Sequence, residues 1–430
     1  MTTYLVVAVF VGAYVLIATE RIHRVSAALG GAALMVVLGV VDAEVAFFSE
    51  ETGVDWNVIF LLLGMMVIVS VLKQTGVFDY LAIWSTKKAR GRPFAVMVML
   101  TMITAVASAL LDNVTTVLLI APVTLLVCER LGLNPVPYLI AEALASNIGG
   151  TATLIGDPPN IIIASRADLS FNDFLVNLAP IVVVLLVVFV GLCRMLFRSA
   201  FVYDEERVAA VMDLDERETI RDKGLLIRSL VVLVAVMIGF VAHSALHVEP
   251  SLVALLGAGT LVAISRLEPP AFLEEVEWPT LVFFMGLFVM VGALVEVGVI
   301  GDLGERVTEA VGENYFLAAT VLLWGSALLS AIVDNIPYVA TVTPLVQGLV
   351  DSGGGATQAN ALWWALALGA DLGGNATAVG ASANVVVIGI AARNGHPISF
   401  WEFTKYGLIV AFVTIALAWP YLYLRYYAFT

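Results

Sequence analysis

Two hexapeptides of this chain match each other 222 residues apart, and each places an Asp-Asn pair inside a strongly apolar run. They are Ser108-Ala-Leu-Leu-Asp-Asn113 and Ser330-Ala-Ile-Val-Asp-Asn335. A carboxylate is costly in hydrocarbon, so an acid at equivalent positions of two segments predicts a duplicated binding site. A chain with this pattern is expected to consist of two homologous halves, here called repeat 1 and repeat 2.

A second pair of motifs lies downstream of each hexapeptide. Residues 147–160 align without gaps onto residues 371–384, and Trp56 matches Trp278 at the same 222-residue spacing as the hexapeptides. The identical pairs within the aligned segments are Gly149 and Gly373, Gly150 and Gly374, Thr153 and Thr377, Gly156 and Gly380, and Asn160 and Asn384. The duplication therefore covers most of the chain.

The composition indicates a membrane protein. Hydrophobic residues make up 61% of the chain, charged residues only 13%, and the mean hydropathy is +0.99. Soluble domains are nearer ~45–50% apolar, so the expected partner of this surface is the lipid bilayer. The net charge of −14 comes from acids grouped in loops and does not indicate a nucleic-acid partner.

Hydropathy predicts ten membrane spans, because about 20 apolar residues cross a bilayer. Two further apolar stretches, 94–127 and 315–350, are interrupted by the Asp-Asn pairs and are predicted to be re-entrant helical hairpins. The predicted fold is an all-α polytopic membrane protein. The expected spans are about 4–19, 25–41, 57–73, 138–165, 175–198, 227–245, 250–265, 279–298, 361–392 and 405–424.

The distribution of basic residues predicts the topology. With the N-terminus outside, only Arg166, Arg306 and Arg425 lie outside, so 18 of the 21 basic residues follow the positive-inside rule. This predicts a multi-pass protein of the cell (plasma) membrane with both termini outside. Five spans per half is an odd number, so the two repeats have inverted topology. The expected boundaries are repeat 1 at 1–198, a cytoplasmic linker at 199–226, and repeat 2 at 227–430.

Two of the spans, 138–165 and 361–392, are predicted to break near the middle of the membrane. Glycine costs ~1 kcal/mol and proline ~3 kcal/mol relative to alanine in a helix interior. Exposed helix ends carry partial charges that hold small ions. The helix-breaking glycines are Gly149, Gly150, Gly156, Gly373, Gly374 and Gly380. The predicted ion or substrate ligands are Asp112, Asn113, Thr116, Asn147, Thr151, Thr153, Asp157, Asn160, Asp334, Asn335, Asp371, Asn375, Thr377, Ser382 and Asn384.

Structural alternatives exist for these residues. Small residues also allow close helix packing, and an isolated intramembrane acid sometimes pairs with a neighbour only for stability. Glu142, which has no counterpart in repeat 2, is the acid for which such a structural pairing is favoured.

The paired Asp-Asn and Gly-Gly-x-x-Thr motifs resemble those of the ion transporter superfamily. Within it the chain is most similar to the branch of arsenite/antimonite permeases and the melanosomal P protein, related to Na⁺/H⁺ antiporters. The resemblance implies a homodimer in which a unit of hairpins and broken helices slides against a scaffold, in an elevator mechanism coupled to protons or Na⁺. The di- and tricarboxylate carriers of the superfamily have Ser-Asn-Thr at both hairpin tips. This chain departs from that pattern, so a dicarboxylate is not the expected substrate.

The leading functional hypothesis is secondary active, proton-coupled export of an arsenite- or antimonite-like oxyacid, with Na⁺/H⁺ antiport as the alternative. The motifs contain four acids and no Lys or Arg, which favours cations over dianions. A Na⁺ near Asp112 and Asp334 is one form of this site, and no cofactor other than Na⁺ or H⁺ is expected. Cys128 and Cys193 lie outside the motifs, so three thiolates do not capture the oxyacid.

Two other classes remain open. An ion channel would show flux without coupling, and an intramembrane aspartyl hydrolase would use two acids as an acid/base pair. Mirrored hairpins have no purpose in hydrolysis, so a carrier is favoured over an enzyme. The chain contains no Gly-x-x-x-x-Gly-Lys-Ser/Thr phosphate loop, and ATP-driven pumping would require a separate ATPase subunit.

Overall fold

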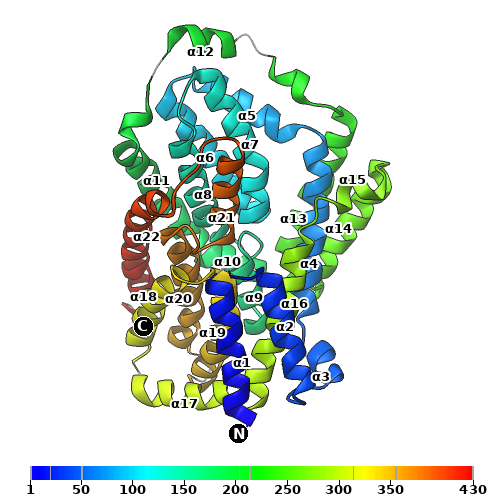
Figure 1. Ribbon diagram of the computed structural model, residues 1–430, viewed down its shortest axis with the longest axis vertical. Coiled ribbons are helices and arrows are strands. Elements are labelled where there is room, and N and C mark those ends of the chain that lie inside the picture. The colour runs from blue at the N-terminus through cyan, green and yellow to red at the C-terminus, as the bar shows by residue number, and fades with distance from the viewer. Residues whose placement is uncertain are drawn as a thin grey trace.

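The computed structural model describes residues 2–19, 21–49, 52–202, 204–212, 215–312, 314–353 and 356–428, and these residues form helices without any β-strand. Figure 1 shows an elongated bundle with α12 (Glu205–Met212) at one end and α17 (Val299–Val311) near the other. The terminal residues Met1 and Thr430, to which the predicted orientation applies, lie outside the described residues.

Each repeat contains a matching series of helices. Repeat 1 consists of α1 (Thr2–Ala18), α2 (Arg24–Val37), α3 (Ala43–Phe48), α4 (Trp56–Gln74), α5 (Val77–Lys88), α6 (Pro93–Leu110), α7 (Asn113–Leu131), α8 (Val136–Gly150), α9 (Pro158–Ala167), α10 (Phe171–Asn177) and α11 (Ala179–Leu196). Repeat 2 consists of α13 (Lys223–Leu246), α14 (Pro250–Ser265), α15 (Pro269–Leu273), α16 (Trp278–Glu296), α17, α18 (Tyr315–Ser330), α19 (Asn335–Ser352), α20 (Thr357–Gly373), η3 (Gly374–Ala376), α21 (Ser382–Arg393), α22 (Phe400–Leu422) and η4 (Tyr423–Tyr427).

The segment between the repeats contains η1 (Arg198–Ala200), α12 and η2 (Glu216–Thr219). The helix after it, α13, begins at Lys223, four residues before the apolar span predicted from hydropathy. The reason is the cap: the Asp222 side chain accepts a hydrogen bond from the Leu225 backbone N–H at 2.9 Å, so the helix starts within the charged segment.

Seven helices of the described residues are long and apolar enough to cross a membrane, namely α4, α6, α7, α11, α13, α16 and α22. Among the other predicted spans, α1, α2 and α14 are shorter, and the remaining two are each split in two. The arms α6 and α7 pass the length criterion, yet only two residues separate them and they pack against each other as a hairpin. Length and hydropathy therefore do not distinguish a hairpin arm from a span.

The contacts between helices follow the duplication. Helix α4 packs against α14, and its counterpart α16 packs against α2. In the same way α6 contacts α8 as α18 contacts α20, and α7 contacts α21 as α19 contacts α9. Each pairing recurs when the repeats are exchanged, which is the signature of two repeats related by a pseudo-twofold axis. The fold is thus two inverted repeats, each with five spans and one helical hairpin.

Glycines allow two equivalent helix pairs, α4 with α14 and α16 with α2, to pack closely. A Cβ added at Gly64 of α4 would lie 2.7 Å from the backbone of Ala254, and one added at Gly286 of α16 would lie 2.8 Å from the backbone of Ala28. Both approaches are too close for any larger residue, so the two helix pairs touch backbone to backbone. The equivalence also aligns Ala28 of α2 with Ala254 of α14.

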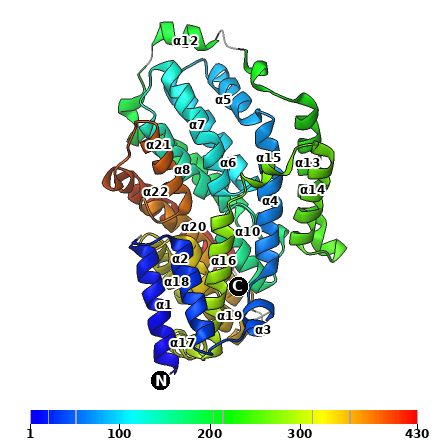
Figure 2. The same cartoon turned by 45° about the vertical axis from the view of Figure 1, so that its right-hand side comes forward.

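The helices form two groups. The scaffold group contains α1, α2, α4, α13, α14 and α16, and the hairpin group contains α6 to α9, α11 and α18 to α22. Figures 1 and 2 show α4, α13 and α14 on one side of the bundle, with α8 and α20 nearer its centre. The scaffold group packs against the hairpin group where α4 meets α7 and α9 and where α16 meets α19, and side chains of α1 and α2 also reach the hairpin group.

Candidate functional site

The first element of the site is the pair of hairpin tips. At the tip of hairpin 1, between α6 and α7, the Asp112 side chain caps α7 and accepts a hydrogen bond from the Thr115 N–H at 2.8 Å. At the tip of hairpin 2, between α18 and α19, the Asp334 side chain caps α19 and accepts from the Ile336 N–H at 3.2 Å. The duplicated acids therefore begin the second arm of each hairpin, as aspartate commonly does at a helix N-cap.

The second element is a buried carboxylate at the meeting point of both hairpins. Asp157, in the break between α8 and α9, is fully buried. Its carboxylate accepts hydrogen bonds from the Asn113 amide at 2.9 Å and from the Asn335 amide at 3.3 Å. The asparagine at each hairpin tip thus donates to one acid. Because Ala381 occupies the equivalent position in repeat 2, this acid is present once and not twice.

Asn147, near the end of α8, links the two broken spans. Its oxygen accepts from the Asn113 amide at 3.0 Å. Its own amide donates to the side-chain oxygens of Asn375 at 3.0 Å and Asn384 at 3.1 Å. The hydrogen bonds therefore run from hairpin 1 through repeat 1 into the break of repeat 2.

A second buried acid lies beside Asp157. Asp371 of α20 is fully buried, and neither of its carboxylate oxygens has a hydrogen-bond partner among the described residues. Thr151 and Asn160 are its polar neighbours, and its charge interacts with that of Asp157. Two acids in a low-dielectric interior repel each other, so a proton or a metal cation between them is strongly stabilising.

Four further buried polar atoms near these acids also lack partners among the described residues. Buried polar atoms are nearly always hydrogen-bonded, so a group of orphans indicates a place where a solute or water binds. Two of the atoms are amide oxygens, which accept, one is a hydroxyl, which can donate or accept, and one is an amide nitrogen, which donates. They are Asn113 Oδ1, Thr116 Oγ1, Asn160 Oδ1 and Asn375 Nδ2.

Other predicted ligands have structural partners instead. Thr153 Oγ1 donates to the Ala109 carbonyl at 2.6 Å, and its counterpart Thr377 donates to the Ala331 carbonyl at 2.6 Å. These bonds hold each break against the end of the first hairpin arm. Asn160 similarly donates to the Thr153 carbonyl at 3.1 Å. Thr153 and Thr377 thus position the site and do not face its centre.

Asn384 makes the clearest bracing contacts, and its loss is expected to destabilise the protein. Its amide donates to the carbonyls of Gly374 and Thr377, both at 2.9 Å. Asn384→Ala leaves these buried acceptors without their donor, which costs about 1–3 kcal/mol. We expect a lower thermal unfolding temperature in detergent. Asn394→Ala, at an exposed amide just after the same helix, is the matched control, and equal temperatures for the two variants would contradict the bracing role.

The sequence analysis missed one residue of this region. Arg24, at the start of α2 in the scaffold group, donates to Ser382 Oγ at 2.5 Å and lies 3.5 Å from the Asp334 carboxylate. The other guanidinium nitrogen donates to Thr280 at 3.2 Å. The positive-inside analysis counted Arg24 as a loop residue, and no motif marks it. The motifs lack a basic residue, but the folded site has one.

Three further hydrogen bonds brace helices of this region. The serines that open the duplicated hexapeptides brace the hairpins: Ser108 donates to the Ser146 carbonyl at 2.7 Å and Ser330 to the Ala370 carbonyl at 2.6 Å. Their equivalent positions in the duplication were a signal that could have identified them. Glu142 accepts a hydrogen bond from the Thr124 hydroxyl of α7, and its other carboxylate oxygen is buried without a partner among the described residues.

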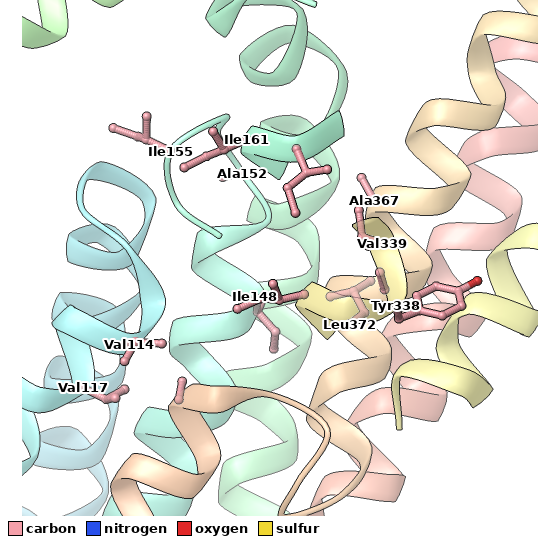
Figure 3. Close-up of a cluster of buried hydrophobic side chains, with 14 of the residues drawn as sticks. Val114, Val117, Ile148, Ala152, Ile155, Ile161, Tyr338, Val339, Ala367 and Leu372 are labelled. Atoms are coloured by element: carbon pink, nitrogen blue, oxygen red, sulfur yellow. The ribbon is translucent and has the colours of Figure 1, made fainter. Parts of the chain in front are cut away.

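Apolar side chains enclose this polar centre. Figure 3 shows Val114 and Val117 of α7, Ile148 of α8, and Val339 of α19 within one buried cluster that also includes Leu372 of α20. Helices from both repeats contribute to it. Apolar surroundings lower the local dielectric constant, which strengthens every electrostatic interaction of the acids.

Comparisons with known proteins agree with this architecture. The profile of a family described as citrate transporters matches residues 14–369. A protein of Mycobacterium tuberculosis described as an uncharacterized transporter is 58% identical over 421 residues, which is 98% of each chain. The human P protein is 34% identical over 493 residues, covering 96% of this chain and 59% of its own length.

One solved structure shares the whole fold. The crystal structure of the Alcanivorax borkumensis YdaH transporter, described as having an unusual topology, aligns with a TM-score of 0.60 over 99% of each chain at 14% sequence identity. The predicted resemblance to the ion transporter superfamily is confirmed, and the relatives named transporters support a carrier. The family match and the relatives that align with nearly the whole chain show that this chain is a multi-pass membrane transporter of the citrate transporter family.

Proposed function

We propose that this chain is a secondary active transporter in which Asp157 and Asp371 together bind the coupling cation, a proton or Na⁺. The observation that carries the proposal is the position of Asp157, which accepts hydrogen bonds from Asn113 of hairpin 1 and Asn335 of hairpin 2. A change in the charge of Asp157 alters hydrogen bonds to both hairpins at once. That is the property a coupling site requires, because ion loading must alter the conformation that exposes the site.

The proposed movement is an elevator motion of the hairpin group against the scaffold group. Side-chain hydrogen bonds join the two groups, and such bonds can be exchanged without unfolding a helix. Tyr14 of α1, for example, donates to the Pro337 carbonyl and contacts the Thr341 hydroxyl on α19. Both broken spans and both hairpins belong to the same group, so Asp157, Asp371 and their asparagine partners would move as one body.

Na⁺/H⁺ antiport is the transport reaction that we favour. No Lys, Arg or His side chain among the described residues bonds to Asp157 or Asp371, and carboxylate and amide oxygens are ligands that suit a small hard cation. Export of a neutral oxyacid is the second candidate. It is favoured by the unpartnered donor of Asn375 and the unpartnered acceptor of Asn113, which together could bind an uncharged hydroxylated solute.

Proton flux in proteoliposomes tests the proposal. The full-length chain is reconstituted with a pH-sensitive dye inside, a pH gradient is imposed, and NaCl, arsenite and citrate are added in turn. Citrate is included because the family description names it. We expect NaCl to dissipate the gradient. Asp371→Asn should reduce this response at least about 30-fold, because the cation loses one of two buried charge partners, worth about 2–5 kcal/mol.

Each solute gives a distinct result. A dye response to arsenite and not to NaCl would replace antiport by oxyacid transport with the same acids. A response to citrate alone would replace it by carboxylate transport. Flux with no coupling between solutes would indicate a channel, and an unchanged Asp371→Asn response would remove the two-acid site.

A further inference from the structure

The duplication predicts equivalent environments at the two hairpin tips, but the structure shows different ones. At hairpin 2 the Asp334 carboxylate accepts a hydrogen bond from the Ser382 hydroxyl at 2.5 Å and lies 3.5 Å from the Arg24 guanidinium. At hairpin 1 no ion pair joins Asp112 to a basic side chain within the part of the chain that the structure describes. One tip therefore contains a positive charge and the other does not.

The pseudo-twofold axis explains the difference. Ala28 of α2 and Ala254 of α14 are equivalent, because each packs backbone to backbone on an equivalent glycine. Counting four residues back from each places Arg24 opposite Pro250. Proline has no charged side chain, so the scaffold group supplies a guanidinium to the tip of hairpin 2 and nothing comparable to the tip of hairpin 1.

Buried oxygens without hydrogen-bond partners lie at the tip of hairpin 1, the tip that lacks the guanidinium. In the first turn of α7, Asn113 Oδ1 and Thr116 Oγ1 are buried without partners among the described residues. In α19 the position equivalent to Thr116 is Tyr338, whose hydroxyl is hydrogen-bonded to Ser326 at 2.8 Å. Repeat 1 thus retains free acceptors where repeat 2 has a guanidinium and a satisfied hydroxyl.

We propose that Arg24 is a built-in cation that takes, at the tip of hairpin 2, the place of a second coupling ion, so that each chain binds one coupling cation, at Asp157 and Asp371, and none beside Asp334. The inference rests on the proposed function, because it states how many coupling cations each chain binds. A guanidinium can replace a bound cation here because it carries one positive charge and donates to both Asp334 and Ser382.

The Arg24 position lies in an open cavity. Arg24, Asp334 and Ser382 line a cavity of about 520 Å³ that is open to the outside of the molecule. The Arg24 and Asp334 side chains are 30% and 16% exposed. Removal of the guanidinium is expected to leave the Asp334 carboxylate open to a cation, in a cavity that Arg21 and His23 also line.

Equilibrium binding of ²²Na⁺ to the purified full-length chain at alkaline pH tests the inference, with choline chloride keeping the ionic strength constant. We expect Arg24→Met to bind one more Na⁺ per chain than the parent protein. Arg24→Lys should bind the parent number, because an ammonium also supplies the charge. The extra ion should disappear in the double variant Arg24→Met with Asp334→Asn.

Folding is monitored by size-exclusion chromatography and thermal unfolding, and Arg24→Gln, which keeps a donor toward Ser382, is the second variant if the methionine variant aggregates. The same Na⁺ number in the parent and in the neutral variants would overturn the inference, leaving Arg24 a structural ion pair. If Asp157→Asn loses the parent ion while Arg24→Met gains none, the proposed function stands and the inference fails. An ion bound by Arg24→Met but not by the parent supports the inference and makes the proton the coupling ion.

Discussion

Replacement of Asp157 by asparagine is expected to reduce coupled transport at least about 100-fold while the protein remains folded in the membrane. The asparagine has nearly the same shape but no negative charge. Removing one partner of a buried charge interaction costs about 3–5 kcal/mol, and each 1.4 kcal/mol is a factor of ten. Both Asn113 and Asn335 would also lose an anionic acceptor, so the coupling between the two hairpins would weaken.

The measurement is the sodium-driven dye response in proteoliposomes at matched protein content. Glu142→Gln is the control, because Glu142 is an equally buried acid of α8 whose partner is Thr124 and not a hairpin tip. We expect its transport rate to stay within a few-fold of the parent. If the two variants lost activity equally, Asp157 would have no special role, and burial of any acid in this region would be the relevant factor.

Gly373→Ala is expected to destabilise the protein by about 1–3 kcal/mol, the usual cost of forcing extra atoms into a packed interior. A Cβ at this position of α20 would lie 2.4 Å from the Ala327 Cα of α18. Since the contact is with backbone, no side-chain rotation relieves it, and the helices must separate. The separation would also loosen the hydrogen bond from Ser330 to the Ala370 carbonyl.

Gly325→Ala is the matched control for this variant. Gly325 lies on α18, the helix that Gly373 faces, but no atom lies within 4 Å of a Cβ added there. Because alanine is favoured over glycine in a helix by about 1 kcal/mol, this change should raise the unfolding temperature slightly or leave it unchanged. Unfolding followed by tryptophan fluorescence in detergent compares them. A Gly373→Ala protein as stable as Gly325→Ala would show that α18 and α20 do not pack this closely.

Much of the architecture followed from the sequence. The Asp-Asn hexapeptides and the aligned segments 147–160 and 371–384 predicted two hairpins and two broken spans, the odd number of spans per half predicted an inverted repeat, and the observed helices have this arrangement. These features depend on local chemistry, since Gly and Pro interrupt a helix wherever they occur and apolar length sets a span. The glycines proved to serve both predicted roles, because α8 ends at Gly150 while Gly149 packs on Ala105 of α6.

The roles of the acids were decided by tertiary structure. From the sequence, Asp112 and Asp334 were prominent because they are duplicated, yet both cap helices at the hairpin tips. The centre of the site contains Asp157 and Asp371, neither of which has an acidic counterpart in the other repeat. Arg24 was found only in the folded chain, because 310 residues separate it from Asp334. A local pattern specifies helices and their breaks, but which charges meet depends on packing between segments that are distant in sequence.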